Sequence, residues 1–179
     1  MSRIQVLDPE KTQAKTKELL DTVKAKMGRV PNILKTMAHS PVALQAYLGL
    51  SGAFTEAKLS PKVREQIALT VGEDNQCHYC LAAHSAIGKL SGLTPEEIES
   101  ARRAKASDPK ANAILQLAKK LSANRGNITD AELAEARGAG CSDEEILEVI
   151  TAVALNLFTN YVNHVANTAI DFPQVPPLS

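Results

Sequence analysis

Helix-start signals divide this chain from one end to the other. A Ser, Thr or Asp followed by Pro, or by Glu three residues later, is typical of the first turn of a helix. Between these signals the apolar residues recur at helical spacing, and no segment shows the alternation of a β-strand. The sequence therefore predicts an all-α fold of about seven or eight helices. The signals are Ser40-Pro41, Ser60-Pro61, Thr94 with Glu97, Asp108-Pro109, Thr129 with Glu132, and Ser142 with Glu145.

The ends of the chain fit the same interpretation. A Lys-rich amphipathic helix is expected over 11–27, because Gly28 and Pro31 stop it. The last helix is expected to run from Ser142 to about residue 170. Beyond it, 171–179 contains three prolines and cannot continue a helix. A chain of 179 residues is long enough for one domain with a real core, so we expect a single domain over 1–179.

Two parts of the chain resemble each other at an offset of 82 residues. Residues 60–86 align with 142–168 without a gap, and the starting serine, the apolar rhythm and one tyrosine coincide. This similarity predicts a duplicated helical hairpin, with a first copy over about 60–91 and a second over about 129–170. Of the two aligned segments, only 60–86 contains cysteines.

Charge and hydropathy limit the kinds of partner. Lys plus Arg equals Asp plus Glu, 20 each, so a nucleic-acid footprint or an electrostatic grip on a membrane is not expected. No apolar run approaches the roughly 20 residues that span a bilayer. The N-terminal residues lack a secretory h-region. We therefore expect a cytoplasmic protein, a compartment in which disulfides are usually catalytic or regulatory.

The most unusual feature is a cluster of Cys77, Cys80 and His84 in a chain with three cysteines in all. The turn residues "GEDNQ" precede it, so a helix should begin near Cys77. Cys80 and His84 would then lie about 6 Å apart on one helix face. Cys77 would lie at the helix N-terminus, where unpaired N–H groups favour a thiolate. Two such thiols can attack and then close into a disulfide.

Glu65 lies in the preceding helix, on a face that is not otherwise charged. If the two helices form an antiparallel hairpin, Glu65 approaches His84. A carboxylate in that position fixes the tautomer of the imidazole and accepts its proton. The alternative is a solvated charge that pairs with a neighbour such as Lys62 or Arg64.

The zinc and haem interpretations of the cluster require residues that the sequence lacks. A structural zinc ion commonly needs two cysteine pairs, and only one is present. Covalent haem attachment needs a histidine directly after the second cysteine, where Leu81 stands. Two incidental buried thiols remain a further alternative. We therefore expect redox chemistry with no metal and no cofactor.

The spacing Glu65-x11-Cys77-x2-Cys80-x3-His84 resembles that of the alkylhydroperoxidase D-like proteins of the carboxymuconolactone decarboxylase family. The segments "VPNILKTMAHSP" and "NYVNHVANTAIDFP" are similar to the peroxidase-related subgroup. The resemblance implies an all-helical homo-oligomer, a trimer or hexamer, with thiol-dependent peroxidase activity. It also implies a peroxide substrate and a dithiol or protein-disulfide reductant.

The resemblance further implies site roles. The motif places a proton relay of Glu65 and His84 on the second cysteine. The helix terminus favours Cys77 as the sulfur that peroxide oxidises, whereas His84, one turn after Cys80 on the same face, favours Cys80. We expect Cys80 to react with peroxide and Cys77 to resolve it, with the reverse assignment as the alternative. One departure is Tyr79, which stands where better-known members carry a histidine. Alternatives are a decarboxylase or lactone-acting relative, which needs no cysteine pair, and a non-enzymatic redox sensor or zinc-binding scaffold. The possible auxiliary residues are His78, Tyr79 and His164.

Overall fold

A computed structural model describes residues 1–178, and all regular structure in this range is helical. The nine α-helices and two 3-10 helices within residues 1–178 confirm the predicted all-α class. The helix α2 was not predicted, because six residues are too few to show a period. The elements are η1 (Pro9–Lys11), α1 (Ala14–Met27), α2 (Asn32–Met37), α3 (Pro41–Ala53), η2 (Phe54–Glu56), α4 (Pro61–Asp74), α5 (His78–Leu90), α6 (Pro95–Arg102), α7 (Pro109–Ala123), α8 (Asp130–Gly138) and α9 (Asp143–Ala166).

The predicted start signals all cap helices. Each capping oxygen accepts a hydrogen bond from the backbone N–H three residues later, and α6, α8 and α9 have complete capping boxes. Gly28 ends α1 in the left-handed conformation, at φ +73°. The helix α9 ends at Ala166, earlier than expected, because Asn167 adopts a left-handed conformation there.

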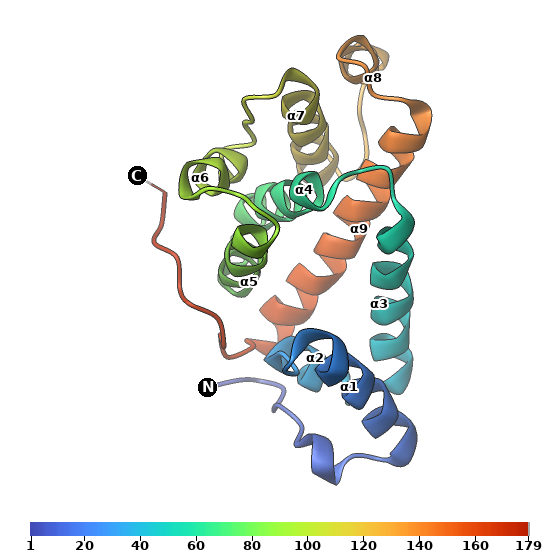
Figure 1. Cartoon of the computed structure of the whole chain (residues 1–179), viewed down its shortest axis with the longest axis vertical. Coiled ribbons are helices and arrows are strands. Elements are labelled where there is room, and N and C mark those ends of the chain that lie inside the picture. Colours follow the sequence, from blue (N-terminus) through green and yellow to red (C-terminus); the bar gives the residue numbers. More distant parts are fainter. Residues whose placement is uncertain (179) are drawn as a thin grey trace.

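The helix α9 runs through the middle of the molecule (Figure 1), with α1 and α2 near one end and α7 and α8 near the other. It packs against α2, α3, α4, α5 and α7. By length and composition alone α9 could cross a membrane, but it also carries the buried polar residues Asn156, Asn160 and Asn163. It is the central helix of this all-α fold.

The structure corrects the prediction of a second hairpin. The chain turns between α4 and α5 at Asn75 and Gln76, and Gln76 has a positive φ of 53°. Leu157 and Phe158 align with Asn75 and Gln76, and α9 continues through both without a break. The helix α8 packs against α7 instead of alongside α9. The similarity at offset 82 thus relates the α4–α5 hairpin to one long helix.

Residues 171–178 of the predicted tail are not helical, as expected, and they are anchored on the turn that carries the cysteines, while residue 179 lies outside the described residues. The Tyr79 hydroxyl donates a hydrogen bond to Asp171 Oδ1 at 2.7 Å and accepts one from the Ile33 N–H at 3.2 Å. Phe172 packs edge-on against the Tyr79 ring. Burial, the largest effect, raises the pKa of Tyr79, so this phenol stays a donor at physiological pH. Tyr79 therefore ties the cysteine helix to α2 and the tail.

Replacing Tyr79 by phenylalanine should lower the free energy of unfolding by about 1–3 kcal/mol, because a buried N–H and a carboxylate lose their partner. Urea denaturation followed by circular dichroism measures this. The control is Ser107→Ala, which removes an exposed hydroxyl. Equal transition midpoints for the two variants would show that the Tyr79 hydrogen bonds do not stabilise the fold.

Candidate active site

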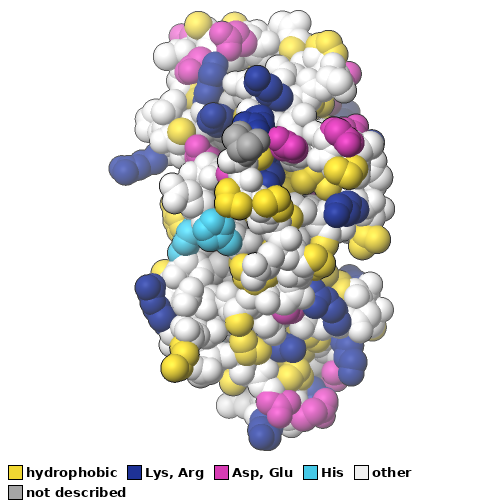
Figure 2. All heavy atoms as spheres, turned by 90° about the vertical axis from the view of Figure 1, so that its left-hand side faces the viewer, with side chains coloured by type: hydrophobic (Ala, Val, Ile, Leu, Met, Phe, Trp, Pro, Cys, Tyr) yellow, Lys and Arg dark blue, Asp and Glu magenta, His cyan; other side chains and the backbone are white. Residues whose placement is uncertain are grey.

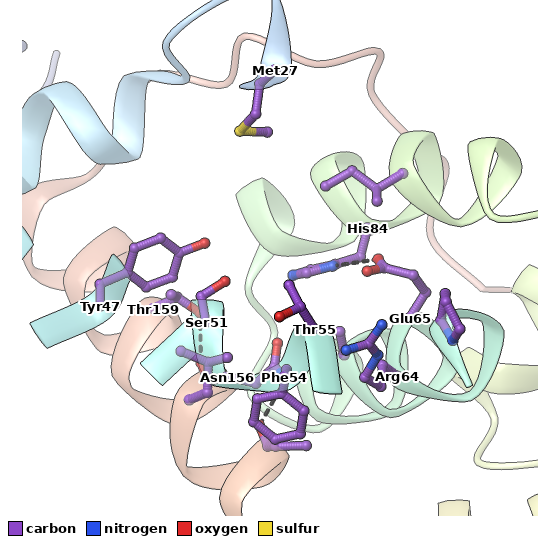
Figure 3. Close-up of a pocket in the computed structure, with 15 residues that line it drawn as sticks. Met27, Tyr47, Ser51, Phe54, Thr55, Arg64, Glu65, His84, Asn156 and Thr159 are labelled. Atoms are coloured by element: carbon purple, nitrogen blue, oxygen red, sulfur yellow. Dashed lines mark hydrogen bonds and ion pairs between the residues drawn. The ribbon is translucent and has the colours of Figure 1, made fainter. Parts of the chain in front are cut away.

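The antiparallel α4–α5 pair brings Glu65 and His84 into contact, the placement that the sequence predicted. Glu65 Oε2 lies 2.8 Å from His84 Nδ1, and both side chains are largely buried. One turn beyond His84, a Cβ added to Gly88 would lie 2.9 Å from Leu93 Cδ1 and 3.8 Å from Glu65 Cβ, so the missing side chain permits close packing. Figure 3 shows the pair on one side of a cavity, with the other ring nitrogen directed away from Glu65. With the proton on Nδ1, Nε2 can act as a base.

Cys77 and Cys80 are joined by a disulfide at the start of α5, and their Cα atoms are 5.2 Å apart. Cys77 is the N-cap residue, and its Sγ accepts a hydrogen bond from the Cys80 N–H at 3.3 Å. The two residues are only 1% and 2% exposed. Cys141 is free and distant from this pair, and burial raises the pKa of its thiol.

Two asparagines of α9 complete the surroundings of the cysteines. Asn160 Nδ2 donates to Cys80 Sγ at 3.0 Å, and Asn163 Nδ2 donates to the same sulfur at 3.3 Å. Asn160 is fully buried. Donors of this kind favour a negatively charged sulfur. The sequence analysis missed both residues. Their signal is the spacing of Asn156, Asn160 and Asn163, which places three amides on one face of an apolar helix.

The Glu65–His84 pair lines a cavity of about 340 Å³, named here the His84 cavity (Figure 3). A smaller cavity of about 60 Å³ is lined by both His84 and Cys80, and it shares Tyr47 and Ile87 with the His84 cavity. The Glu65–His84 pair and the second cysteine therefore line adjoining cavities. The other residues around the His84 cavity include Met27, Ser51, Phe54, Thr55, Arg64, Asn156 and Thr159.

Tyr47 lies across this cavity from Glu65 and His84 (Figure 3). Burial raises the pKa of its phenol, a hydrogen bond with Ser51 acts in the opposite direction, and the negative charge of Glu65 raises it further. The hydroxyl thus stays protonated and can donate to an oxygen atom bound in the cavity.

The auxiliary histidines do not join the Glu65–His84 pair. His78 and His164 line a separate cavity of about 590 Å³, which Cys77 also lines and which is named here the Cys77 cavity. His164 Nε2 is 2.9 Å from the carbonyl oxygen of Asn75. Within residues 1–178, no group of three or more His, Cys, Asp or Glu side chains is placed to hold a metal ion.

The fold and the site together define a helical two-cysteine domain with a paired glutamate and histidine. Residues 41–120 match the carboxymuconolactone decarboxylase family, and this stretch contains all four motif residues. The resemblance seen in the sequence is therefore confirmed over that part of the chain. No curated protein matches.

Solved structures confirm the alkylhydroperoxidase D-like fold. An alkylhydroperoxidase AhpD core protein from Ralstonia eutropha JMP134, described as an uncharacterized peroxidase-related protein, is 24% identical. The match covers 95% of this chain and 92% of that one, with a TM-score of 0.86. An uncharacterized peroxidase-related protein from Silicibacter sp. TM1040 is 26% identical over 93% and 89%, with a TM-score of 0.81. The debrominase Bmp8 is 20% identical over 94% and 92%, with a TM-score of 0.80.

Proposed function

We propose that this protein is a thiol-dependent reductase of hydrogen peroxide or organic hydroperoxides that serves antioxidant defence in the cytoplasm. The observation that carries the proposal is the setting of Cys80. The Cys80 sulfur accepts hydrogen bonds from the side-chain amides of Asn160 and Asn163. Cys80 also lines the small cavity together with His84, whose Nδ1 is in contact with the Glu65 carboxylate. The family match and the peroxidase-related structural neighbours support an enzyme of this class.

The chemistry begins with the reduced pair. His84 removes the proton of the Cys80 thiol, and Asn160 and Asn163 stabilise the thiolate. The thiolate attacks one peroxide oxygen and the O–O bond breaks. The departing hydroxide or alkoxide takes a proton from the His84 imidazolium, which Glu65 stabilises. Cys80 is now a sulfenic acid.

Cys77 completes the cycle. Its thiolate attacks the sulfur of the Cys80 sulfenic acid, hydroxide departs and is protonated to water, and the disulfide forms. A dithiol then supplies two electrons and two protons, and both cysteines return to thiols. The disulfide of the structure is the oxidised state in this cycle.

The test is peroxide consumption by the purified protein with dithiothreitol as electron donor, using hydrogen peroxide and cumene hydroperoxide in separate assays. The proposal predicts many turnovers per protein, an unchanged rate for Cys141→Ser, and a Cys77–Cys80 disulfide when the donor is omitted. Consumption of a single equivalent despite excess donor would identify a sensor. Inertness toward both peroxides would favour the decarboxylase or lactone-acting alternative, for which the cysteines are not needed.

We also propose that the protein assembles as a homo-oligomer, a trimer or hexamer. The exposed apolar residues Leu147, Ile150, Tyr161 and Val165 recur on one face of α9, and the chain contains only three Phe, three Tyr and no Trp for its own core.

Figure 2 shows acidic and basic side chains mixed over the face that it draws, which supports the expectation of no nucleic-acid partner.

Placing a charge on this α9 face should dissociate the oligomer. For the Leu147→Glu, Val165→Glu double variant we expect the mass of a single chain in size-exclusion chromatography with light scattering, because each buried carboxylate would lack a partner. Ala134→Glu on the exposed side of α8 is the matched control and should keep the assembly. An unchanged mass in the double variant would place the interface elsewhere.

A further inference from the structure

The two cysteines of the disulfide line different cavities. Cys80 lines the small cavity that it shares with His84, and Cys77 does not. Cys77 lines the cavity of about 590 Å³, and Cys80 does not. Tyr79 and Asn163 line both spaces and form the wall between them. A molecule that enters one cavity therefore meets one of the two cysteines first.

Charge and hydrogen bonding also differ between the two ends of the disulfide. Among the described residues, the Cys77 cavity is lined by Arg3, His78 and His164 and by no carboxylate. Such a lining raises the local concentration of an anion such as a thiolate. Cys80 receives the two close amide hydrogen bonds, whereas the distance from Asn163 Nδ2 to Cys77 Sγ is 3.9 Å. Cys80 is therefore the better leaving group, because its thiolate is the more strongly stabilised.

We propose that the Cys77 cavity is the binding site of the reducing dithiol, separate from the cavity through which peroxide reaches Cys80. This inference rests on the proposed peroxidase function and deepens it. Because Cys77 is only 1% exposed, the reductant must present a slender dithiol that reaches into the cavity. A flat protein surface carrying a thiol does not meet this requirement.

The exchange balances within this geometry. The reductant thiolate attacks Cys77 Sγ, the bond between the two cysteines breaks, and its electron pair passes to Cys80 Sγ beside Asn160 and Asn163. The second thiol of the reductant then attacks its own sulfur in the mixed disulfide. Cys77 leaves and takes the proton of that thiol, and Cys80 is protonated through His84. The reductant leaves as a disulfide, oxidised by two electrons.

The experiment measures the two half-reactions separately, by rapid quenching with a thiol alkylating reagent followed by mass spectrometry. Ala169 lines the Cys77 cavity and is exposed, so Ala169→Trp fills this space without touching the other. We expect reduction by dithiothreitol to slow by roughly 10²-fold, since a misplaced reactant loses about that much. Oxidation of the reduced variant by hydrogen peroxide should keep the wild-type rate. Ala134→Trp, on α8, is the control for adding an exposed tryptophan and should change neither rate.

A second readout identifies the attacked sulfur. Oxidised protein treated with the monothiol 2-mercaptoethanol and quenched early should carry the mixed disulfide on Cys77. An adduct on Cys80, or equal reduction rates for Ala169→Trp and wild type, would overturn the site while peroxide oxidation remained intact. Failure of the reduced wild type to react with peroxide would instead overturn the proposed function.

Discussion

Replacing Cys80 by serine should abolish peroxide turnover, with a loss of roughly 10³-fold or more, as expected when the nucleophile of a concerted site is removed. A serine hydroxyl stays protonated at neutral pH, so neither His84 nor the two amides can make it an effective nucleophile. The measurement is steady-state consumption of hydrogen peroxide with excess dithiothreitol.

Cys77→Ser is the matched variant and should behave differently. It retains Cys80 with both asparagine donors, so it should consume about one equivalent of peroxide rapidly and then stop, because nothing resolves the sulfenic acid. If Cys80→Ser showed this single-equivalent reaction and Cys77→Ser were inert, the two cysteines would exchange roles.

Glu65→Gln should slow the oxidation of the reduced protein by about 10²–10⁴-fold, the usual contribution of a general acid–base group. Glutamine fills the same space but supplies no negative charge to stabilise the His84 imidazolium across the 2.8 Å contact. His84→Ala should cause a similar loss, and the double variant should be little worse, since residues that act as a unit are not additive.

The control for this series is Glu73→Gln in the same helix. Glu73 pairs with Arg102 at 2.6 Å. It lines neither the His84 cavity nor the small cavity that Cys80 shares with His84. The Glu73→Gln variant should have a lower free energy of unfolding but an unchanged rate of thiol oxidation. A Glu65→Gln protein that matched the wild-type rate between about pH 6 and 8, around the usual pKa of histidine, would leave Glu65 a structural partner only.

The local features of this fold could be read from the sequence because they depend on neighbouring residues. Caps such as Ser60 and Thr94 satisfy N–H groups only three residues away, and the Cys77–Cys80 bridge needs only the geometry of one helical turn. The contact of Glu65 with His84 was also accessible, since a short turn between two helices leaves few ways to pack them.

Contacts between residues far apart in the chain could not be predicted from the sequence. Asn160 meets Cys80 across 80 residues of chain, and Tyr79 meets Asp171 across 92. Such contacts follow from where α9 and the tail lie in three dimensions. The prediction of a second hairpin was wrong for a related reason. A weak similarity in the spacing of apolar residues does not distinguish a turn from a continued helix. In the first copy that turn is formed by Asn75 and Gln76.

Trapping of the sulfenic acid tests most directly the claim that Cys80 is the sulfur that peroxide oxidises. Reduced Cys77→Ser protein is treated with one equivalent of hydrogen peroxide in the presence of dimedone, and the adduct is located by peptide mapping beside the Cys80→Ser protein. The account predicts an adduct at Cys80 in the first protein and little or none at Cys77 in the second. An adduct at Cys77 in the second protein, or none in either, would contradict it.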